Sequence, residues 1–246
     1  MTSFLQKKAM YYAQQQNAIP TDGLVCYMPL SEDIEDKTGN KVVRNVTTSP
    51  TSTSTGNENL RFGYVDGIPC MTKIGGRNDY TLSRGSLDLP TNSDDVTISL
   101  WVRVSSDLSS IVRVLRYSSY SASGGDYFGL RVASTGGFAL DVYSGTAPVI
   151  LSGTSVIREK WYNVCIMDRN GKRYGYVDGE QKLVSTIKKK LTSDVNTNYN
   201  YGSLWVMVQS VSTELVNLAS VRIYDRILTQ AEITALAHEF NPTTKA

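Results

Sequence analysis

Residues 160–187 read KWYNVCIMDRNGKRYGYVDGEQKLVSTI, in which three runs rich in β-branched and aromatic residues are separated by Asn170-Gly171 and Asp178-Gly179. Asn-Gly and Asp-Gly supply the positive φ angles that a two-residue type I′ turn requires. The runs on either side have the composition of strands. The stretch therefore predicts three antiparallel strands joined by two tight hairpins, and an all-β fold built around them.

A further strand signal lies in VTISLWVRV, residues 96–104. Its side chains alternate with a period of two, which is typical of an antiparallel strand with one face in the core and one toward water. The side chains expected in the core are Val96, Ile98, Leu100, Val102 and Val104. The opposite, wetter face carries Thr97, Ser99, Trp101 and Arg103.

The C-terminal part combines a strand, LASVRIYDR, with a well-marked helix start. Thr229 and Glu232 have the spacing of a capping box, and Leu228 and Ile233 have that of a hydrophobic staple. An apolar stripe then predicts an amphipathic helix over residues 230–240. Because such a helix needs a sheet to lie against, we expect a two-sheet antiparallel β-sandwich, or jelly roll, with the helix packed on it.

The N-terminal residues differ in pattern from the rest of the chain. Leu5, Ala9 and Tyr12 recur at helical spacing, which predicts a short helical arm over residues 1–22 ahead of a sandwich domain at residues 23–246. A helix this short is marginal in water unless it packs against something. The arm is therefore either a frayed end or a docking segment.

Composition excludes several classes of function. The chain has 246 residues, 41% of them hydrophobic, which is enough for one well-packed domain. Its 25 Lys and Arg against 23 Asp and Glu do not favour nucleic acid as a partner. No apolar run approaches a membrane span, and no secretory signal is evident. Cys26, Cys70 and Cys165 are too few and too widely spaced for a zinc site, and we expect free, buried thiols.

The acidic and nucleophilic residues do not form a recognisable catalytic pattern. Glu32, Asp33, Glu35 and Asp36 cluster in a segment that we interpret as a solvated turn, not as the paired carboxylates of a glycoside hydrolase. The single histidine, His238, falls late in the predicted helix, where it serves no nucleophile. We therefore expect a protein that is not an enzyme.

Tyrosines in polar, glycine- and serine-rich segments are the candidate ligand contacts. Tyrosine combines a flat apolar face, which can stack on a sugar ring or a protein surface, with a polar hydroxyl. The expected ligand-binding residues are Tyr117, Tyr120, Tyr127, Tyr199 and Tyr201.

Five motifs in order resemble the laminin-G-like jelly roll of the concanavalin A-like lectin/glucanase superfamily. They are GLVCYMPLSEDIEDKTGN, GGRNDYTL, VTISLWV, KWYNVCIMDRNGKRYGYVDGE and LASVRIYDRILTQAEITAL. The resemblance covers about residues 23–241. It implies two packed antiparallel sheets that act as a carbohydrate-binding or protein-adhesion module.

Members of this family often hold a structural calcium, and the resemblance places one candidate ligand at Asp79, in the GxxDY-like motif. The family's second group of ligands, an acidic pair before the VRIY strand, is replaced here by Leu218-Ala219-Ser220. Calcium needs several oxygen ligands. We therefore expect no cofactor, and calcium at Asp79 is the alternative.

The resulting hypothesis is a non-catalytic adhesion module that binds cell-surface glycans and is displayed in many copies on a larger assembly. Because no secretory signal is evident, we expect a particle assembled in the cytoplasm, such as a bacteriophage virion, with residues 1–20 docking on another assembly protein. The alternatives are an exported glycan-binding protein of a bacterial surface and a purely structural assembly protein without a glycan ligand.

Overall fold

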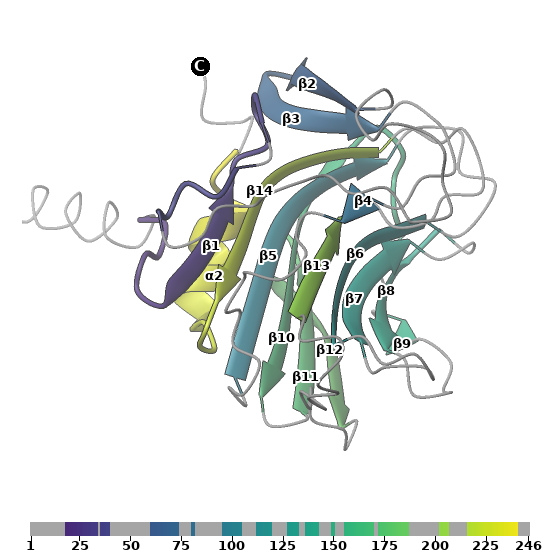
Figure 1. The fold of residues 1–246 in the computed structure, drawn as a ribbon. Coiled ribbons are helices and arrows are strands. Elements are labelled where there is room, and N and C mark those ends of the chain that lie inside the picture. The colour runs from purple at the N-terminus through teal and green to yellow at the C-terminus, as the bar shows by residue number, and fades with distance from the viewer. Residues whose placement is uncertain are drawn as a thin grey trace, which may run out of the picture.

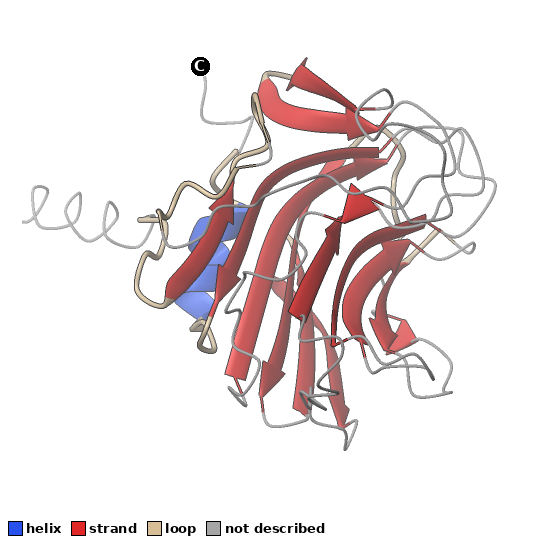
Figure 2. Cartoon of the chain, viewed as in Figure 1, coloured by secondary structure: helices blue, strands red, loops and turns tan. Residues whose placement is uncertain are grey.

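The computed structural model describes residues 18–33, 35–39, 60–73, 80–81, 95–104, 112–119, 127–132, 136–142, 149–150, 155–169, 172–186, 202–206 and 216–240. These residues form two antiparallel sheets and a single helix, α2 (Figures 1 and 2). The predicted two-sheet sandwich is confirmed. Of the predicted arm at residues 1–22, residues 1–17 lie outside the described residues.

The larger sheet has the strand order β12-β11-β10-β5-β14-β3-β2, and β1 pairs with the free part of the β14 edge. Every pairing in it is antiparallel. Its strands are β1 (Leu24–Met28), β2 (Leu60–Val65), β3 (Ile68–Lys73), β5 (Asp95–Val104), β10 (Trp161–Arg169), β11 (Lys172–Val177), β12 (Glu180–Thr186) and β14 (Val216–Tyr224).

The smaller sheet has the order β4-β13-β6-β7-β8-β9 and is also antiparallel throughout. It packs across the larger sheet (Figure 1). Its strands are β4 (Tyr80–Thr81), β6 (Val112–Ser119), β7 (Tyr127–Val132), β8 (Phe138–Val142), β9 (Val149–Ile150) and β13 (Gly202–Val206).

The hairpin chemistry at Asp178-Gly179 produces the expected turn. Asp178 and Gly179 have φ angles of 50° and 81°, and they join β11 to β12. The pairing of Arg169 with Lys172 joins β10 to β11 across the Asn170-Gly171 position. The predicted three-stranded meander is therefore present.

Strand β5 is buried on both faces, which corrects the prediction of one wet face. Its valines, Ile98 and Leu100 enter the core between the sheets, as expected. Trp101 is only 4% exposed, however, because Phe240 covers it edge-on at 5.4 Å between ring centroids. Thr97 is buried as well, and its hydroxyl donates to the carbonyl of Arg226 at 2.6 Å.

Helix α2 (Gln230–Ala237) provides part of this second cover. Its start is as predicted: Thr229 accepts from the backbone of Glu232, whose side chain accepts from the backbone of Thr229. Leu228, Ile233 and Leu236 pack with Cys165 and Met167 of β10. The helix ends at Ala237, three residues before the predicted end, and exposed His238 is its C-cap.

A buried ionic network fixes the chain just after α2. The Arg222 guanidinium hydrogen-bonds both carboxylate oxygens of Glu239, at 2.6 and 2.7 Å, and lies 4.2 Å from the centroid of the Tyr27 ring. Ser220 also bonds Glu239 and has a φ angle of 54°, at a bulge where β14 changes its neighbour from β3 to β1. The network therefore ties β1, β14 and the C-terminal segment together.

The N-terminal edge of the described region also belongs to the packed structure. Ile19 packs against the cluster beneath α2, and the Tyr224 hydroxyl donates to the carbonyl of Pro20 at 3.0 Å. Burial raises the pKa of the Tyr224 hydroxyl. The three cysteines are free and buried, as predicted.

Candidate functional site

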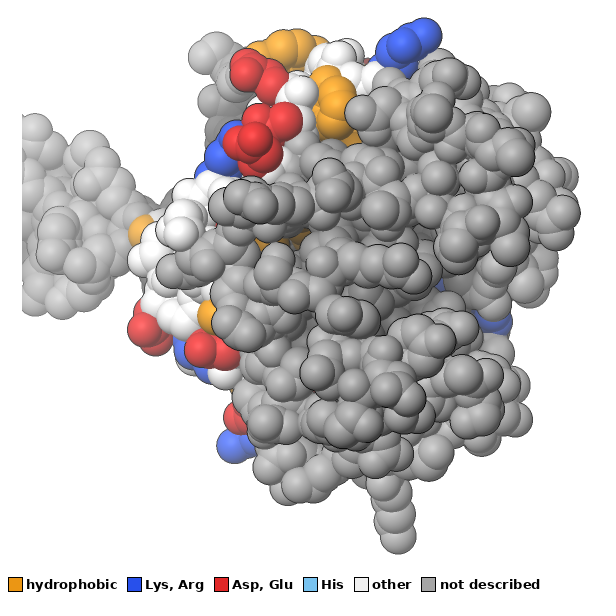
Figure 3. Space-filling model, in the orientation of Figure 1, with side chains coloured by type: hydrophobic (Ala, Val, Ile, Leu, Met, Phe, Trp, Pro, Cys, Tyr) orange, Lys and Arg blue, Asp and Glu red, His pale blue; other side chains and the backbone are white. Residues whose placement is uncertain are grey.

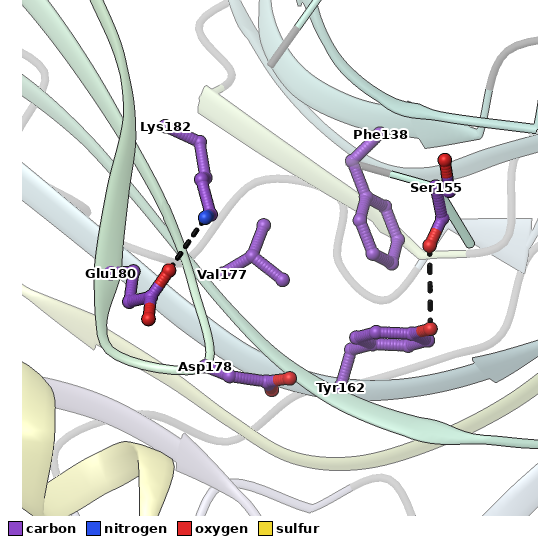
Figure 4. Close-up of a pocket in the computed structure, with 7 residues that line it drawn as sticks. All are labelled: Phe138, Ser155, Tyr162, Val177, Asp178, Glu180 and Lys182. Atoms are coloured by element: carbon purple, nitrogen blue, oxygen red, sulfur yellow. Dashed lines mark hydrogen bonds and ion pairs between the residues drawn. The ribbon is translucent and has the colours of Figure 1, made fainter. Parts of the chain in front are cut away.

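A pocket of about 200 Å³ lies between the two sheets at one end of the sandwich. Phe138 comes from the start of β8, and the other lining residues come from the chain before β10 and from β10, β11, β12 and the turn between the last two. The lining residues, all shown in Figure 4, are Phe138, Ser155, Tyr162, Val177, Asp178, Glu180 and Lys182.

The floor of the pocket is apolar and aromatic. Phe138 and Tyr162 meet edge-on, with 5.4 Å between ring centroids and 77° between ring planes. Both are buried in the core that the sheets share, which fixes their positions. The Tyr162 hydroxyl accepts from the backbone N–H of Ile157 at 2.8 Å and donates to the carbonyl of Ser155 at 3.4 Å. The segment that carries Ser155 is thereby held against the floor.

The rim of the pocket is polar and charged. Exposed Glu180 accepts from Lys182 Nζ at 2.6 Å, as drawn in Figure 4. Asp178 Oδ1 accepts from the backbone N–H of Asn163 at 2.9 Å, and its Oδ2 lies 4.0 Å from Lys160 Nζ. The rim thus offers carboxylate oxygens as acceptors and ammonium groups as donors, close to an apolar floor.

Helix α2 holds the turn that carries this rim. The Gln230 side chain donates to the carbonyl of Gly179 at 2.8 Å. A side chain at Gly179 would contact Ala237 Cβ at 3.4 Å, and the positive φ angle of Gly179 is one that glycine adopts without strain. The positive φ angle therefore explains why this position is glycine, and the contacts between the turn and α2 explain why the rim has a fixed place.

The pKa values of the two rim carboxylates are shifted in opposite directions from their ordinary values. Burial raises the pKa of Asp178 above its ordinary value, against the lowering effect of the Asn163 N–H. The hydrogen bond from Lys182 lowers the pKa of Glu180. A pair of carboxyl groups with separated pKa values is a feature of glycoside hydrolases.

The exposure of these carboxylates distinguishes them from a hydrolytic pair. The side chains of Asp178 and Glu180 are 40% and 75% exposed, and each has a lysine neighbour. Hydrolytic sites use a low-dielectric, enclosed environment to hold one carboxyl protonated near neutral pH. The rim is instead suited to reversible hydrogen bonding with a polar ligand.

The acidic cluster at residues 32–36 does not line the pocket, and one of its members, Asp36, has a structural role. Asp36 is buried, which corrects the expectation of a solvated turn. Its carboxylate accepts from the backbone N–H groups of Tyr27 and Thr38, at 2.8 and 3.0 Å. Asp33 and Glu35 share Lys37 at the surface.

The structure places two of the five candidate tyrosines in strands instead of loops. Tyr117 lies in β6, paired with Phe128 and Leu204, and Tyr127 begins β7. Tyr120, Tyr199 and Tyr201 lie outside the described residues, and so does Asp79. Their assignment as ligand contacts, and calcium at Asp79, therefore stay predictions.

The pocket is not evident from the sequence, because the residues that line it fit the patterns of ordinary secondary structure. In the sequence, Asp178 has the pattern of a hairpin residue and Tyr162 has that of a strand residue. The available signal was the polar run of residues 178–182, which directly follows a strand and contains two acids and a lysine. It gave no indication that Phe138 lies opposite.

Two aromatic side chains form a second feature of the surface. Phe62 and Tyr64 on β2 are 38% and 77% exposed. Figure 3 shows hydrophobic side chains over the β2–β3 hairpin, at the top of the view. Neither Phe62 nor Tyr64 lines the pocket.

The described part of the chain contains no helix long and apolar enough to cross a membrane. Within the same residues, no three His, Cys, Asp or Glu side chains come together as a metal-binding group.

Solved structures similar to this one include domains of proteins that act on or bind carbohydrates. Domain 4 of an extracellular GH43 arabinanase from Geobacillus stearothermophilus, solved with arabinotriose, has a TM-score of 0.68 and 16% identity over 89% of this chain and 100% of that chain. Trypanosoma rangeli sialidase, solved with a difluorinated sugar-acid derivative, has a TM-score of 0.64 and 16% identity over 89% of this chain. The chain spans 33% of the length of that sialidase.

The receptor-binding domain of a botulinum neurotoxin C/D mosaic serotype is also similar, with a TM-score of 0.64 and 12% identity over 89% of this chain and 51% of that chain. At such identities the likeness is one of fold. No curated protein sequence matches the chain. The family model of the concanavalin A-like lectin/glucanases superfamily matches residues 75–234. The chain therefore belongs to the concanavalin A-like lectin/glucanase superfamily.

Proposed function

We propose that this protein is a non-catalytic carbohydrate-binding module and that the pocket between β8 and the β11–β12 turn is its binding site. The observation that carries the proposal is the combination of an apolar floor with a rim of paired donors and acceptors at Asp178, Glu180 and Lys182. Sugars present both apolar C–H faces and hydroxyl groups. A small concave site with a few oriented polar groups suits them.

The family supports this proposal, and so does the likeness to the arabinanase domain that was solved with arabinotriose. The exposure of both rim carboxylates favours binding over hydrolysis, because neither is enclosed. We expect single-site affinity to be weak, since a polar open pocket must release ordered water.

The test is a glycan array probed with the whole chain, followed by the double variant Asp178→Asn, Lys182→Met. Both changes keep the side-chain shape and remove a charge, and asparagine tolerates the left-handed backbone at residue 178. The matched control is Asp33→Asn, Lys37→Met, which alters a surface acid–lysine pair of 2.8 Å elsewhere. We expect the first variant alone to lose binding.

Two other outcomes would relocate or reject the site. Loss of binding in Tyr64→Ala, or in a variant with the five candidate tyrosines changed to alanine, would place the binding site at those residues and not in the pocket. Hydrolysis of any polysaccharide by the purified chain, abolished by Asp178→Asn, would show an enzyme.

We also propose display of this module in many copies on a larger assembly, with residues 1–20 as the docking segment. Weak single sites gain avidity when they are presented together. Deleting residues 1–17 should leave thermal stability nearly unchanged, because the deletion keeps Ile19 and Pro20, which contact the packed domain. The same deletion should reduce incorporation into the particle, and unchanged incorporation would contradict the proposal.

A further inference from the structure

We propose that the pocket accepts one uncharged sugar unit and discriminates against acidic sugars. This inference rests on the proposed carbohydrate-binding function and adds the size and the charge of the ligand. It follows from the volume of the pocket and from the way in which its charges are already paired.

The size of the pocket points to a single sugar unit. Its volume of about 200 Å³ is below the roughly 300–1,000 Å³ of pockets that take drug-sized ligands. The floor is closed by Phe138 and Tyr162, which are buried in the shared core and cannot move apart without disturbing it. A longer saccharide must therefore leave all but one of its units outside the pocket.

The charge pattern points to an uncharged sugar. Lys182 is engaged by Glu180 at 2.6 Å, and Lys160 lies 4.8 Å from the centroid of the Tyr162 ring and 4.0 Å from Asp178. The carboxylate of an acidic sugar that accepts from Lys182 would share this lysine with Glu180, and it would then lie beside the negatively charged Glu180 carboxylate. Such like-charge contacts are a means of rejecting a ligand.

A neutral sugar meets no such obstacle. Its hydroxyls are donors to the outer lone pairs of the Asp178 and Glu180 carboxylates, which accept several hydrogen bonds each. The same hydroxyls accept from Lys182 while the Glu180–Lys182 pair stays intact. The rim carboxylates therefore act as acceptors whose charge is already balanced by the neighbouring lysines.

The experiment is a titration of the whole chain with methyl glycosides of arabinose, galactose and glucose, and with glucuronate and N-acetylneuraminate, followed by isothermal calorimetry or NMR shifts. We expect at least one neutral glycoside to bind with a dissociation constant on the order of 1 mM. We expect the two acidic sugars to bind about tenfold more weakly or not at all.

The variant Glu180→Gln separates charge selection from general binding. It releases Lys182 from its ionised partner and removes one negative charge, so acidic sugars should gain affinity. Neutral glycosides lose a carboxylate acceptor at residue 180 and should bind no more tightly than they bind the wild-type chain. Glu35→Gln is the matched control, because Glu35, like Glu180, pairs with a lysine two residues further along the chain. The distance is 3.3 Å for Glu35 and 2.6 Å for Glu180. That variant should change neither.

The outcomes distinguish this inference from the proposed function. Acidic sugars that bind the wild-type chain as tightly as neutral ones would overturn the charge selection. Oligosaccharides that bind while no methyl glycoside does would overturn the single-unit inference and leave the proposed function standing. No binding of any carbohydrate would overturn both.

Discussion

Two acid–base pairs that include a residue of the larger sheet lie in opposite environments. Arg222 of β14 and Glu239 of the C-terminal segment are largely buried, with 5% and 13% of their side chains exposed. Lys182 and Glu180 form an equally short pair at the rim of the pocket, but 27% and 75% of their side chains are exposed. In the first region, removing one partner leaves the other charge buried away from water. In the second region, water or a ligand can take the place of the lost partner at a small cost in free energy.

The largest expected effect is therefore on the buried side. Glu239→Ala leaves the Arg222 guanidinium buried and without its carboxylate, and we expect the free energy of unfolding to fall by about 3 kcal/mol. Chemical denaturation measures this loss. Glu180→Ala is the counterpart at the rim and should leave the denaturation midpoint unchanged. Equal losses of stability in the two variants would show that burial does not determine how much each ion pair contributes.

The next effect sharpens the comparison through pH. Arg226 and Thr229 hydrogen-bond the Glu232 carboxylate and lower its pKa to about 2. A depressed folded-state pKa adds stability above the ordinary pKa of glutamate, and this stability is lost as the pH falls from about 4.5 toward 2. Glu232→Gln should cost about 1.5 kcal/mol at pH 7 and flatten the stability profile in that range. An unchanged acid profile would contradict the role of this pair.

A smaller effect is expected at the N-cap of α2. Thr229→Ala removes the side-chain oxygen that accepts from the backbone of Glu232, and we expect a loss of about 1 kcal/mol. Thr229→Ser keeps the oxygen and should restore most of that loss. Thermal unfolding of both variants checks the prediction, and equal destabilisation by serine and alanine would exclude the capping bond as the cause.

The smallest effect on stability is expected at the pocket. Burial raises the pKa of Asp178, so ionisation of this group opposes folding, and its contribution to stability falls as the pH rises through the raised pKa. Asp178→Asn removes the charge and keeps an acceptor for the Asn163 N–H. Stability at pH 7 should be unchanged or slightly higher. A clear loss of stability would mean that Asp178 supports the fold as Glu239 does.

The sequence predicted those features that neighbouring residues determine. The Asp178-Gly179 hairpin and the capping box of Thr229 and Glu232 each depend on a few consecutive residues, and both are present. The alternation in residues 96–104 also identified the correct core face. It did not predict that Trp101 is buried, because the ring that covers it belongs to Phe240, far along the chain.

The pocket was not predictable for the same reason. It needs Phe138 from one sheet and Tyr162 from the other, and no local pattern shows that these rings meet. Tyrosine content drew attention to Tyr117 and Tyr127, which the structure places within strands of the smaller sheet. The composition of a segment identified which chemistry was available, but not which residues the fold brings together.

The double pairing of β14 has a consequence for biosynthesis. This strand completes β1 through residues 221–224 and β3 through residues 216–218, and its Tyr224 hydroxyl reaches Pro20, 204 positions away in the chain. A ribosome makes β14 long after β1 and β3. Until β14 has been synthesised, β1 and β3 lack this pairing partner, and pairings so distant in sequence form slowly. Nascent chains halted before residue 216 should therefore be the species that most needs protection from aggregation.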